Sequence, residues 1–109
     1  MVEVQLHERT QALLSEPTLG NQNVDAKVRS LLEAEYLRQM ARYRRVDQAL
    51  SQKYGLSFDE FVEQRMTERH GYVWEVEQDA MDWETAIGGI ATMRRKLGEL
   101  REIANEHQV

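Results

Sequence analysis

The longest regular pattern in the chain is a run of apolar residues, spaced mostly three and four positions apart, across residues 72–104. Its members are Val73, Val76, Ala80, Trp83, Ile87, Ile90, Leu97, Leu100 and Ala104. This spacing places them on one stripe of a long α-helix, with Arg94 standing where the pattern asks for another apolar residue. An isolated helix leaves such a stripe in water, so we predict that it packs against a partner surface. That surface can belong to this chain, to a second copy or to a different protein.

A second pattern of the same kind precedes the first. Apolar and aromatic residues recur three or four positions apart at Leu32, Tyr36, Met40, Tyr43, Val46, Leu50 and Tyr54. Asn23 or Asp25 can cap the start of a helix here, and Gly55 can end it. A helix over residues 25–54 is roughly 45 Å long at the usual rise per residue, so we expect an elongated molecule.

The segment between the two patterns carries its own helix signals. Ser57 stands three residues before Glu60, which is the spacing of a capping box. We therefore predict a short helix over residues 58–69, which Gly71 ends. In the last helix, Gly88 and Gly89 each cost about 1 kcal/mol relative to alanine. We expect another helix to pass close to this pair, or the helix to bend there.

These patterns predict an all-α fold of two long antiparallel amphipathic helices joined by a short helix. We assign residues 24–109 to this helical domain, and residues 1–23 to an N-terminal arm or short helix followed by a linker. A helix through Ser15 that stops before Pro17 is favoured, while alternation at Val2, Val4 and Leu6 leaves a short strand open. An arm that becomes ordered on a partner is a further alternative. The predicted core positions are Leu32, Tyr36, Met40, Tyr43, Val46, Leu50, Phe58, Phe61, Val76, Ala80, Trp83, Ile87, Ile90 and Leu97.

The composition excludes several classes of protein. A chain of 109 residues, 41% hydrophobic and 30% charged, suits one small domain. No run of about 18 apolar residues is present, so no membrane span is expected. Residues 1–14 lack the basic start and apolar run of a secretory signal, and we expect a cytoplasmic location. The absence of cysteine excludes disulfides, thiolate catalysis and cysteine-bound zinc.

Charge is unevenly distributed along the chain, whose net charge is −5. A basic band lies in the first long helix, at Arg38, Arg42, Arg44 and Arg45. An acidic band lies at the start of the last helix, at Glu75, Glu77, Asp79, Asp82 and Glu84. If the long helices are antiparallel, the two bands lie near each other. A nucleic-acid contact through the arginines and neighbouring tyrosines is an alternative, which the net negative charge disfavours.

We expect no metal site, no cofactor and no catalytic residues. The histidines lie far apart and lack metal-ligand spacing: His7, His70 and His107. A solvated surface accounts for the acidic residues that share one helix face, Glu75, Asp79 and Asp82. The capping role accounts for Ser57, and no phosphate-binding loop or nucleophile motif is present. The sequence thus favours a non-enzymatic protein.

The two tryptophans are expected to have different environments. Trp74 and Trp83 are nine residues apart, so on one helix they point in nearly opposite directions. Trp83 falls on the apolar stripe and is predicted to be core. Trp74 lies beside Tyr72, and we weigh packing at the helix junction, which is favoured, against exposure on a partner-binding surface.

Two stretches of the chain carry a family resemblance: YGLSFDEF at residues 54–61 and HGYVWEVEQDAMDWE at residues 70–84. The chain resembles small all-helical prokaryotic proteins whose genes lie beside a toxin-like protein of the TumE type. The similarity covers residues 34–100. The resemblance implies an antitoxin that binds and neutralises a cognate toxin.

An acidic antitoxin of this kind is expected to dock on a basic toxin. Carboxylates would steer the association and aromatic side chains would anchor it. The candidate partner-binding residues are Tyr72, Trp74, Glu75, Glu77, Asp79, Asp82 and Glu84. In the alternative, the long helices pair with a second copy, and the protein is a homodimeric scaffold or adaptor without a toxin partner.

Overall fold

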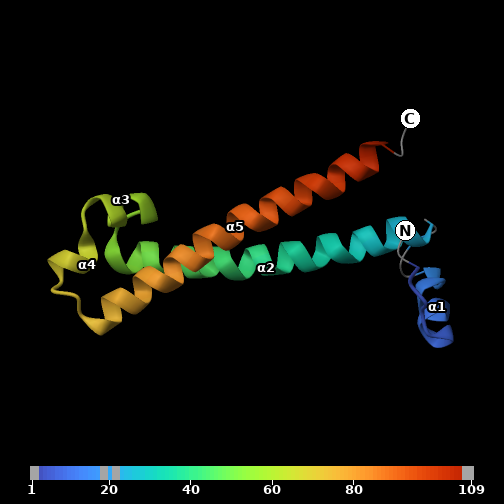
Figure 1. Cartoon of the computed structure of the whole chain (residues 1–109), viewed down its shortest axis with the longest axis horizontal. Coiled ribbons are helices and arrows are strands. Elements are labelled where there is room, and N and C mark those ends of the chain that lie inside the picture. The colour runs from blue at the N-terminus through green and yellow to red at the C-terminus, as the bar shows by residue number, and fades with distance from the viewer. Residues whose placement is uncertain (1–2, 18–19, 21–22, 107–109) are drawn as a thin grey trace.

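The computed structural model describes residues 3–17, 20 and 23–106, and these fold into helices without any strand. The helices are α1 (Glu8–Leu14), α2 (Val24–Tyr54), α3 (Phe58–Glu63), α4 (Met66–Arg69) and α5 (Trp74–Glu106). Helices α2 and α5 pack against each other as an antiparallel hairpin, with α3 and α4 at the turn (Figure 1). The predicted fold class is confirmed.

The molecule is elongated, as the helix lengths predicted. Its extents are 58 × 32 × 27 Å and its radius of gyration is 20.0 Å. A compact domain of this length has a radius of gyration of about 13 Å. We call the end with α3 and α4, residues 53–84, the closed end. We call the other end, residues 24–40 of α2 and 93–106 of α5, the open end.

Local hydrogen bonds fix where α2 and α3 begin and where α2 ends. The Asn23 side chain accepts from the Ala26 amide at 2.8 Å at the start of α2. Gly55 ends α2 in the left-handed conformation, with φ of 66°. At α3, the Ser57 hydroxyl accepts from the Glu60 amide and the Glu60 carboxylate accepts from the Ser57 amide. The predicted capping box is confirmed.

The single short helix predicted over residues 58–69 is wrong, because Arg65 breaks it. Arg65 adopts a left-handed conformation with φ of 52° and separates α3 from α4. Phe61 and Met66 both pack in the cluster around Trp83. Five residues apart on one continuous helix, they would point about 140° from each other. The break at Arg65 lets both side chains reach the same core.

The core consists of two clusters along the hairpin. At the closed end, Phe61, Val76 and Trp83 are buried together with Leu50, which lies just before it in α2. Further toward the open end, Met40, Met93 and Leu97 form a smaller cluster. Ile90 is also buried, and the remaining predicted positions are partly buried, with one exception.

That exception is Leu32, whose core assignment is wrong because it is 38% exposed. The stripe on α5 also differs from the predicted one. Val73 precedes the helix and is exposed, Arg94 points away from the core, and Met93 takes the apolar position that the pattern lacked.

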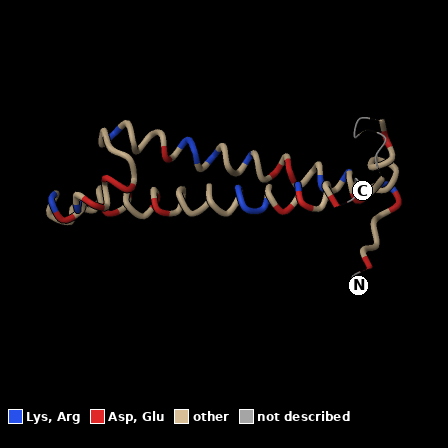
Figure 2. Tube along the Cα trace, turned by 90° about the horizontal axis from the view of Figure 1, so that it is seen from above, with Lys and Arg blue, Asp and Glu red and all other residues tan. Residues whose placement is uncertain are grey.

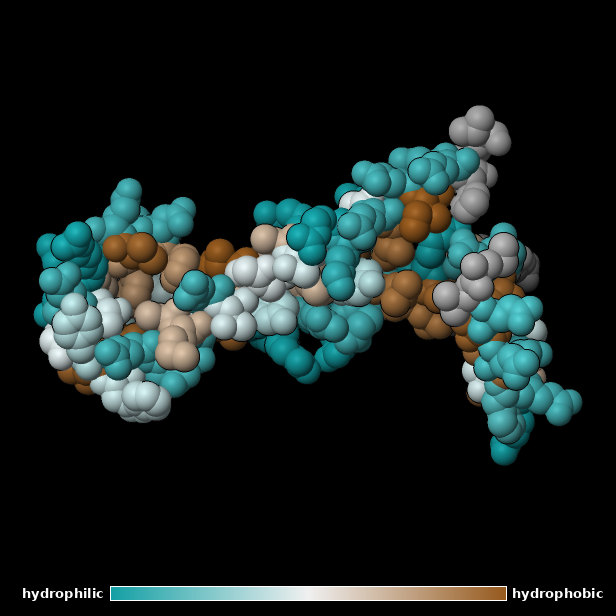
Figure 3. Space-filling model, in the orientation of Figure 1, coloured by the Kyte–Doolittle hydropathy of each residue, from teal (hydrophilic) through white to brown (hydrophobic). Residues whose placement is uncertain are grey.

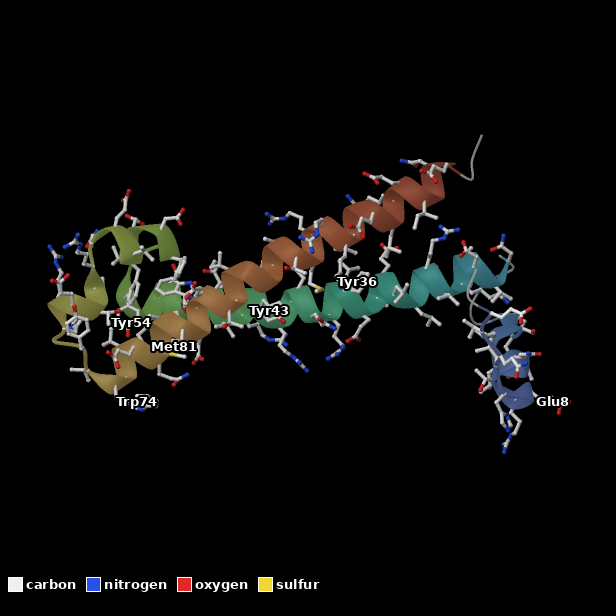
Figure 4. All side chains as sticks on the ribbon, in the orientation of Figure 1. Glu8, Tyr36, Tyr43, Tyr54, Trp74 and Met81 are labelled. Atoms are coloured by element: carbon white, nitrogen blue, oxygen red, sulfur yellow. The ribbon has the colours of Figure 1, made fainter. Side chains whose placement is uncertain are left out.

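The close helix approach predicted at the glycine pair occurs at Gly89 alone. A Cβ atom placed on Gly89 would lie 2.4 Å from the ring of Tyr43, whereas one on Gly88 meets nothing within 4 Å. Tyr43 and Tyr36 lie between α2 and α5 (Figure 4). The absence of a side chain at Gly89 therefore lets α5 cross the ring of Tyr43.

The N-terminal arm contains α1, which ends before Pro17 as predicted. Lys27, a buried residue of α2, donates from its Nζ atom to the carbonyl oxygen of Leu14. This bond ties the end of α1 to the first turns of α2. The predicted linker lies partly outside the described residues, at positions 18–19 and 21–22, and so does His107.

Candidate functional site

A turn of unusual backbone conformation exposes the aromatic residues at the start of α5. Gly71 and Tyr72 are both left-handed, with φ of 69° and 57°. The Gly71 amide bonds to the Glu68 carbonyl and the Tyr72 amide to the Thr67 carbonyl. This turn ends α4 and redirects the chain so that α5 begins at Trp74. Tyr72 is 62% exposed and Trp74 is 72% exposed.

The outward face of α5 carries Trp74 and Met81. Seven residues separate them, which is nearly two helical turns, so they lie on one face. Met81 is 61% exposed, and Figure 4 shows Trp74 pointing away from the rest of the molecule. The favoured interpretation of Trp74 as junction core is therefore wrong. We call the surface formed by Trp74 and Met81 the apolar strip.

Two rows of carboxylates flank the apolar strip. Glu75 and Asp82 are seven residues apart and lie on one side of it, while Glu77 and Glu84 lie on the other. Glu75, Asp82 and Glu84 are exposed, and Glu77 is half-buried. Figure 2 shows acidic residues gathered at the closed end. The strip is thus an apolar surface inside a negative rim.

Asp79, a further predicted partner-binding residue, is held inside the molecule. Its Oδ2 atom accepts hydrogen bonds from Lys53 Nζ at 2.6 Å and from Tyr54 Oη at 2.5 Å. Lys53 also pairs with Glu75 at 2.7 Å. The side chain of Asp79 is only 16% exposed. Its position indicates that it joins α5 to the end of α2.

The same contacts shift three pKa values. Burial acts to raise the pKa of Asp79, but the hydrogen bonds from Lys53 and Tyr54 outweigh it and the net shift is downward. Burial raises the pKa of Tyr54 to about 12, and the hydrogen bond to Asp79 adds to the effect. The hydrogen bonds to Asp79 and Glu75 raise the pKa of Lys53. The cluster is therefore most favourable with Asp79 ionised, Tyr54 neutral and Lys53 charged.

Trp83 supports the strip from the opposite side of α5. It is fully buried, and its Nε1 atom donates to Asp47 Oδ1 at 2.8 Å. The rings of Tyr54, Phe58 and Phe61 lie 5.0–6.1 Å from neighbouring ring centroids in this cluster. This aromatic packing holds the first turns of α5 in place. The predicted core role of Trp83 is confirmed.

Sequence reasoning missed Asp47 and Lys53, although one signal pointed to Asp47. A buried indole N–H needs an acceptor, and Asp47 lies four residues after Tyr43 and three before Leu50, on the inward side of α2. Lys53 gives no comparable signal, because its partners lie 22 and 26 residues away.

A shallow groove lies between α3, α4 and α5, and it reaches the negative rim at Glu84. Its volume is about 270 Å³. Tyr72 and Glu84 line it, together with the apolar residues Phe58, Phe61 and Val62. Val62 is exposed, so the groove adds apolar contact area on α3. The closed end thus offers apolar area and negative charge to a binding partner.

The basic band lies outside this site. Arg38 pairs with Glu35 of its own helix at 2.5 Å, and Arg42 lines a groove with Asp82 of α5. The two bands therefore approach each other, but within the described residues the ion pairs between the helices are made by Lys53.

The described residues contain no group of three or more potential ligands that could hold a metal ion. None of the helices in the ranges described is long and apolar enough to cross a bilayer.

Comparisons with models of protein families, with characterised proteins and with solved structures find no match to this chain.

Proposed function

We propose that the protein is a non-enzymatic helical interaction module that binds a basic protein partner through the apolar strip. One observation carries the proposal: Trp74 is 72% exposed on a helix whose other face is locked in the core. Tryptophan is enriched among the residues that dominate binding energies. Tyr72, Val73 and Met81 are exposed as well, and a group of large exposed apolar side chains marks an interaction site.

The negative rim specifies the chemistry of the partner. Residues 53–84 contain nine acidic and three basic residues, for a net charge of −6 with histidine neutral. Such a surface accelerates association with a positively charged protein and repels an acidic one. The carboxylates on both sides of the strip would pair with basic residues around a central apolar contact, as interfaces with a polar rim do.

The family resemblance supplies the partner class. We infer that the chain is a cytoplasmic prokaryotic antitoxin and that its partner is a TumE-type toxin encoded beside it. Neutralisation then requires only that the antitoxin covers a functional surface of the toxin. No reactive group on this chain has to take part.

Co-expression of the chain with the neighbouring toxin tests this proposal. The toxin alone should arrest growth, and the wild-type chain should restore it. Trp74→Ala should weaken binding by at least about 30-fold, since truncation of a central anchor costs about 2 kcal/mol or more. Leu37→Ala, which alters an exposed leucine of α2, is the matched control and should bind like the wild type.

The rim is tested in the same binding assay. Glu77→Gln combined with Glu84→Gln should lower the association rate and reduce its dependence on salt. A neighbour that is harmless alone, or that stays toxic beside the wild-type chain, contradicts the antitoxin assignment. Neutralisation that survives Trp74→Ala with unchanged affinity contradicts the site.

A further inference from the structure

A second apolar surface lies at the open end, far from the apolar strip. On α2 it includes Val28 and Leu32, which are 40% and 38% exposed, and on α5 it includes Ile103, which is 37% exposed. Tyr36 and Leu100 are partly buried beside them. In Figure 3, hydrophobic side chains gather on both arms of the open end. We call these five residues the open-end face.

The five residues lie on the same side of the hairpin. Lys96 Nζ of α5 lies over the ring of Tyr36 of α2, 5.6 Å from its centroid, so both side chains face one side. On α2, Leu32 precedes Tyr36 by four residues and neighbours it on the helix surface, and Val28 continues the same row one turn further on. On α5, Leu100 and Ile103 follow Lys96 by four and seven residues and share its face. The two rows form one surface across both helices.

The helices are not fully packed at this end. A cleft of about 180 Å³ lies between them. Its lining combines small and apolar residues with three charged ones: Ala26, Ser30, Leu97, Leu100, Ala104, Arg29, Glu33 and Arg101. The chain exposes 8587 Å² of surface, whereas a compact monomer of 12.8 kDa exposes about 6300 Å². A stable interface needs about 800 Å² from each partner. The excess is spread over the elongated chain, and it is larger than the area that one side of a dimer contact needs.

The charge of the open end is compatible with a second copy of this chain as its partner. The open end contains seven basic and six acidic residues, a net charge of +1, whereas the closed end carries −6. The closed ends of two copies repel each other, because both carry the same negative charge. At the open end the mixed charges are compatible with self-association, and Figure 2 shows both signs alternating there. We propose that a second copy of this chain covers the open-end face, so that the protein is a homodimer.

The charge also favours one arrangement of the dimer. Two-fold symmetry places the same face of both copies in contact. If the copies run in opposite directions, the two closed ends point away from each other and avoid repulsion. Each closed end then remains free to bind its own partner. The dimer contact and the proposed partner contact use different residues, so each can be lost separately.

Light scattering and sedimentation over a range of concentrations test the proposal on the full chain. The wild type should be dimeric at high micromolar concentration. Leu32→Asp and Ile103→Asp should each raise the dimer dissociation constant by at least about tenfold, because each buries a carboxylate in both halves of the contact. Leu37→Asp is the matched control, since Leu37 is exposed elsewhere on α2. It should leave the dimer intact.

A distance measurement keeps the proposal testable if an aspartate variant unfolds. The chain has no cysteine, so single spin labels can be placed at Leu32→Cys and Val62→Cys. The distance between copies should be short for the first label and much longer for the second. A monomeric wild type, a dimer unaffected by both aspartate variants, or a shorter distance at residue 62 would overturn the proposal. Trp74→Ala should remain dimeric, which separates this test from that of partner binding.

Discussion

At the residue scale, the contact of Tyr54 and Lys53 with Asp79 is the most informative polar contact. It joins the last turn of α2 to the first turns of α5, although α3 and α4 lie between these two segments in the sequence. Burial of a carboxylate is costly unless donors satisfy it. Here an ammonium and a phenol do so together. The contact therefore stabilises the closed end only while each group keeps its charge state.

This arrangement predicts a pH dependence. Because the pKa of Tyr54 is raised to about 12 in the folded chain, its contribution is complete below the unfolded value of about 10 and is lost as pH rises between the two. The raised pKa of Lys53 acts in the same direction. Tyr54→Phe should cost about 1 kcal/mol at neutral pH and show a smaller alkaline loss of stability than the wild type.

Urea unfolding followed by circular dichroism from neutral to strongly alkaline pH measures this difference. Tyr72→Phe, at an exposed tyrosine, should retain the wild-type profile. An alkaline loss of the same size in Tyr54→Phe would show that Tyr54 is not its source. At the acid end, the lowered pKa of Asp79 adds stability above about pH 4, which is lost as pH falls through the folded value.

At the element scale, the crossing of α2 and α5 depends on a missing side chain. Gly89 faces the ring of Tyr43, and Gly88 faces open space. Gly88→Ala should raise the unfolding free energy by up to about 1 kcal/mol through helix propensity. Gly89→Ala gains the same propensity but must displace the ring, at a cost of about 1–3 kcal/mol. We expect it to be less stable than the wild type.

Denaturant melts of the two variants check this prediction, since the glycines are adjacent in one helix and serve as controls for each other. Equal gains in both would mean that Tyr43 moves aside freely. A loss in both would mean that the helix needs flexibility at this pair rather than a close crossing.

Much of the element-level description followed from the sequence, because it depends on local signals. The two apolar stripes, the Asn23 cap, the Ser57–Glu60 box and the Gly55 end are all encoded within a few turns. The break at Arg65 is not, because arginine has no preference for the left-handed region. It follows instead from tertiary packing, which draws Phe61 and Met66 to the same side.

The candidate site was only partly predictable for a similar reason. Periodicity placed Trp74 opposite Trp83, but only the turn at Gly71 and Tyr72 decides that Trp74 faces water. The inward position of Asp79 depends on Lys53 and Tyr54, so it requires the register of two distant helices. Leu32 fits the stripe on α2, yet the packed surface at the open end leaves it exposed.

At the scale of the whole molecule, the two ends differ in packing. The cluster around Trp83 collects side chains from α2, α3, α4 and α5, whereas the cluster around Met40 uses α2 and α5 alone. Local stability follows the density of such contacts. The open end should therefore unfold locally more often than the closed end.

Hydrogen exchange should reveal this difference. At low protein concentration, amides of residues 26–36 and 97–104 should exchange faster than those of residues 76–90. Raising the concentration should slow exchange at the first two segments alone, because a dimer contact stabilises them by mass action. Protection that is uniform along the hairpin and independent of concentration would contradict both the uneven packing and the dimer.

The bond from Trp83 to Asp47 and the fit of Gly89 against Tyr43 have a joint mechanical consequence. The two contacts fix the register of α5 against α2 at successive points along the hairpin. A shift of α5 by one helical turn would break both contacts. We therefore expect sliding of one helix along the other, a known kind of conformational switch, to be unfavourable here. The distance between the two binding ends is then constant, and we expect binding at one end to leave the conformation of the other end unchanged.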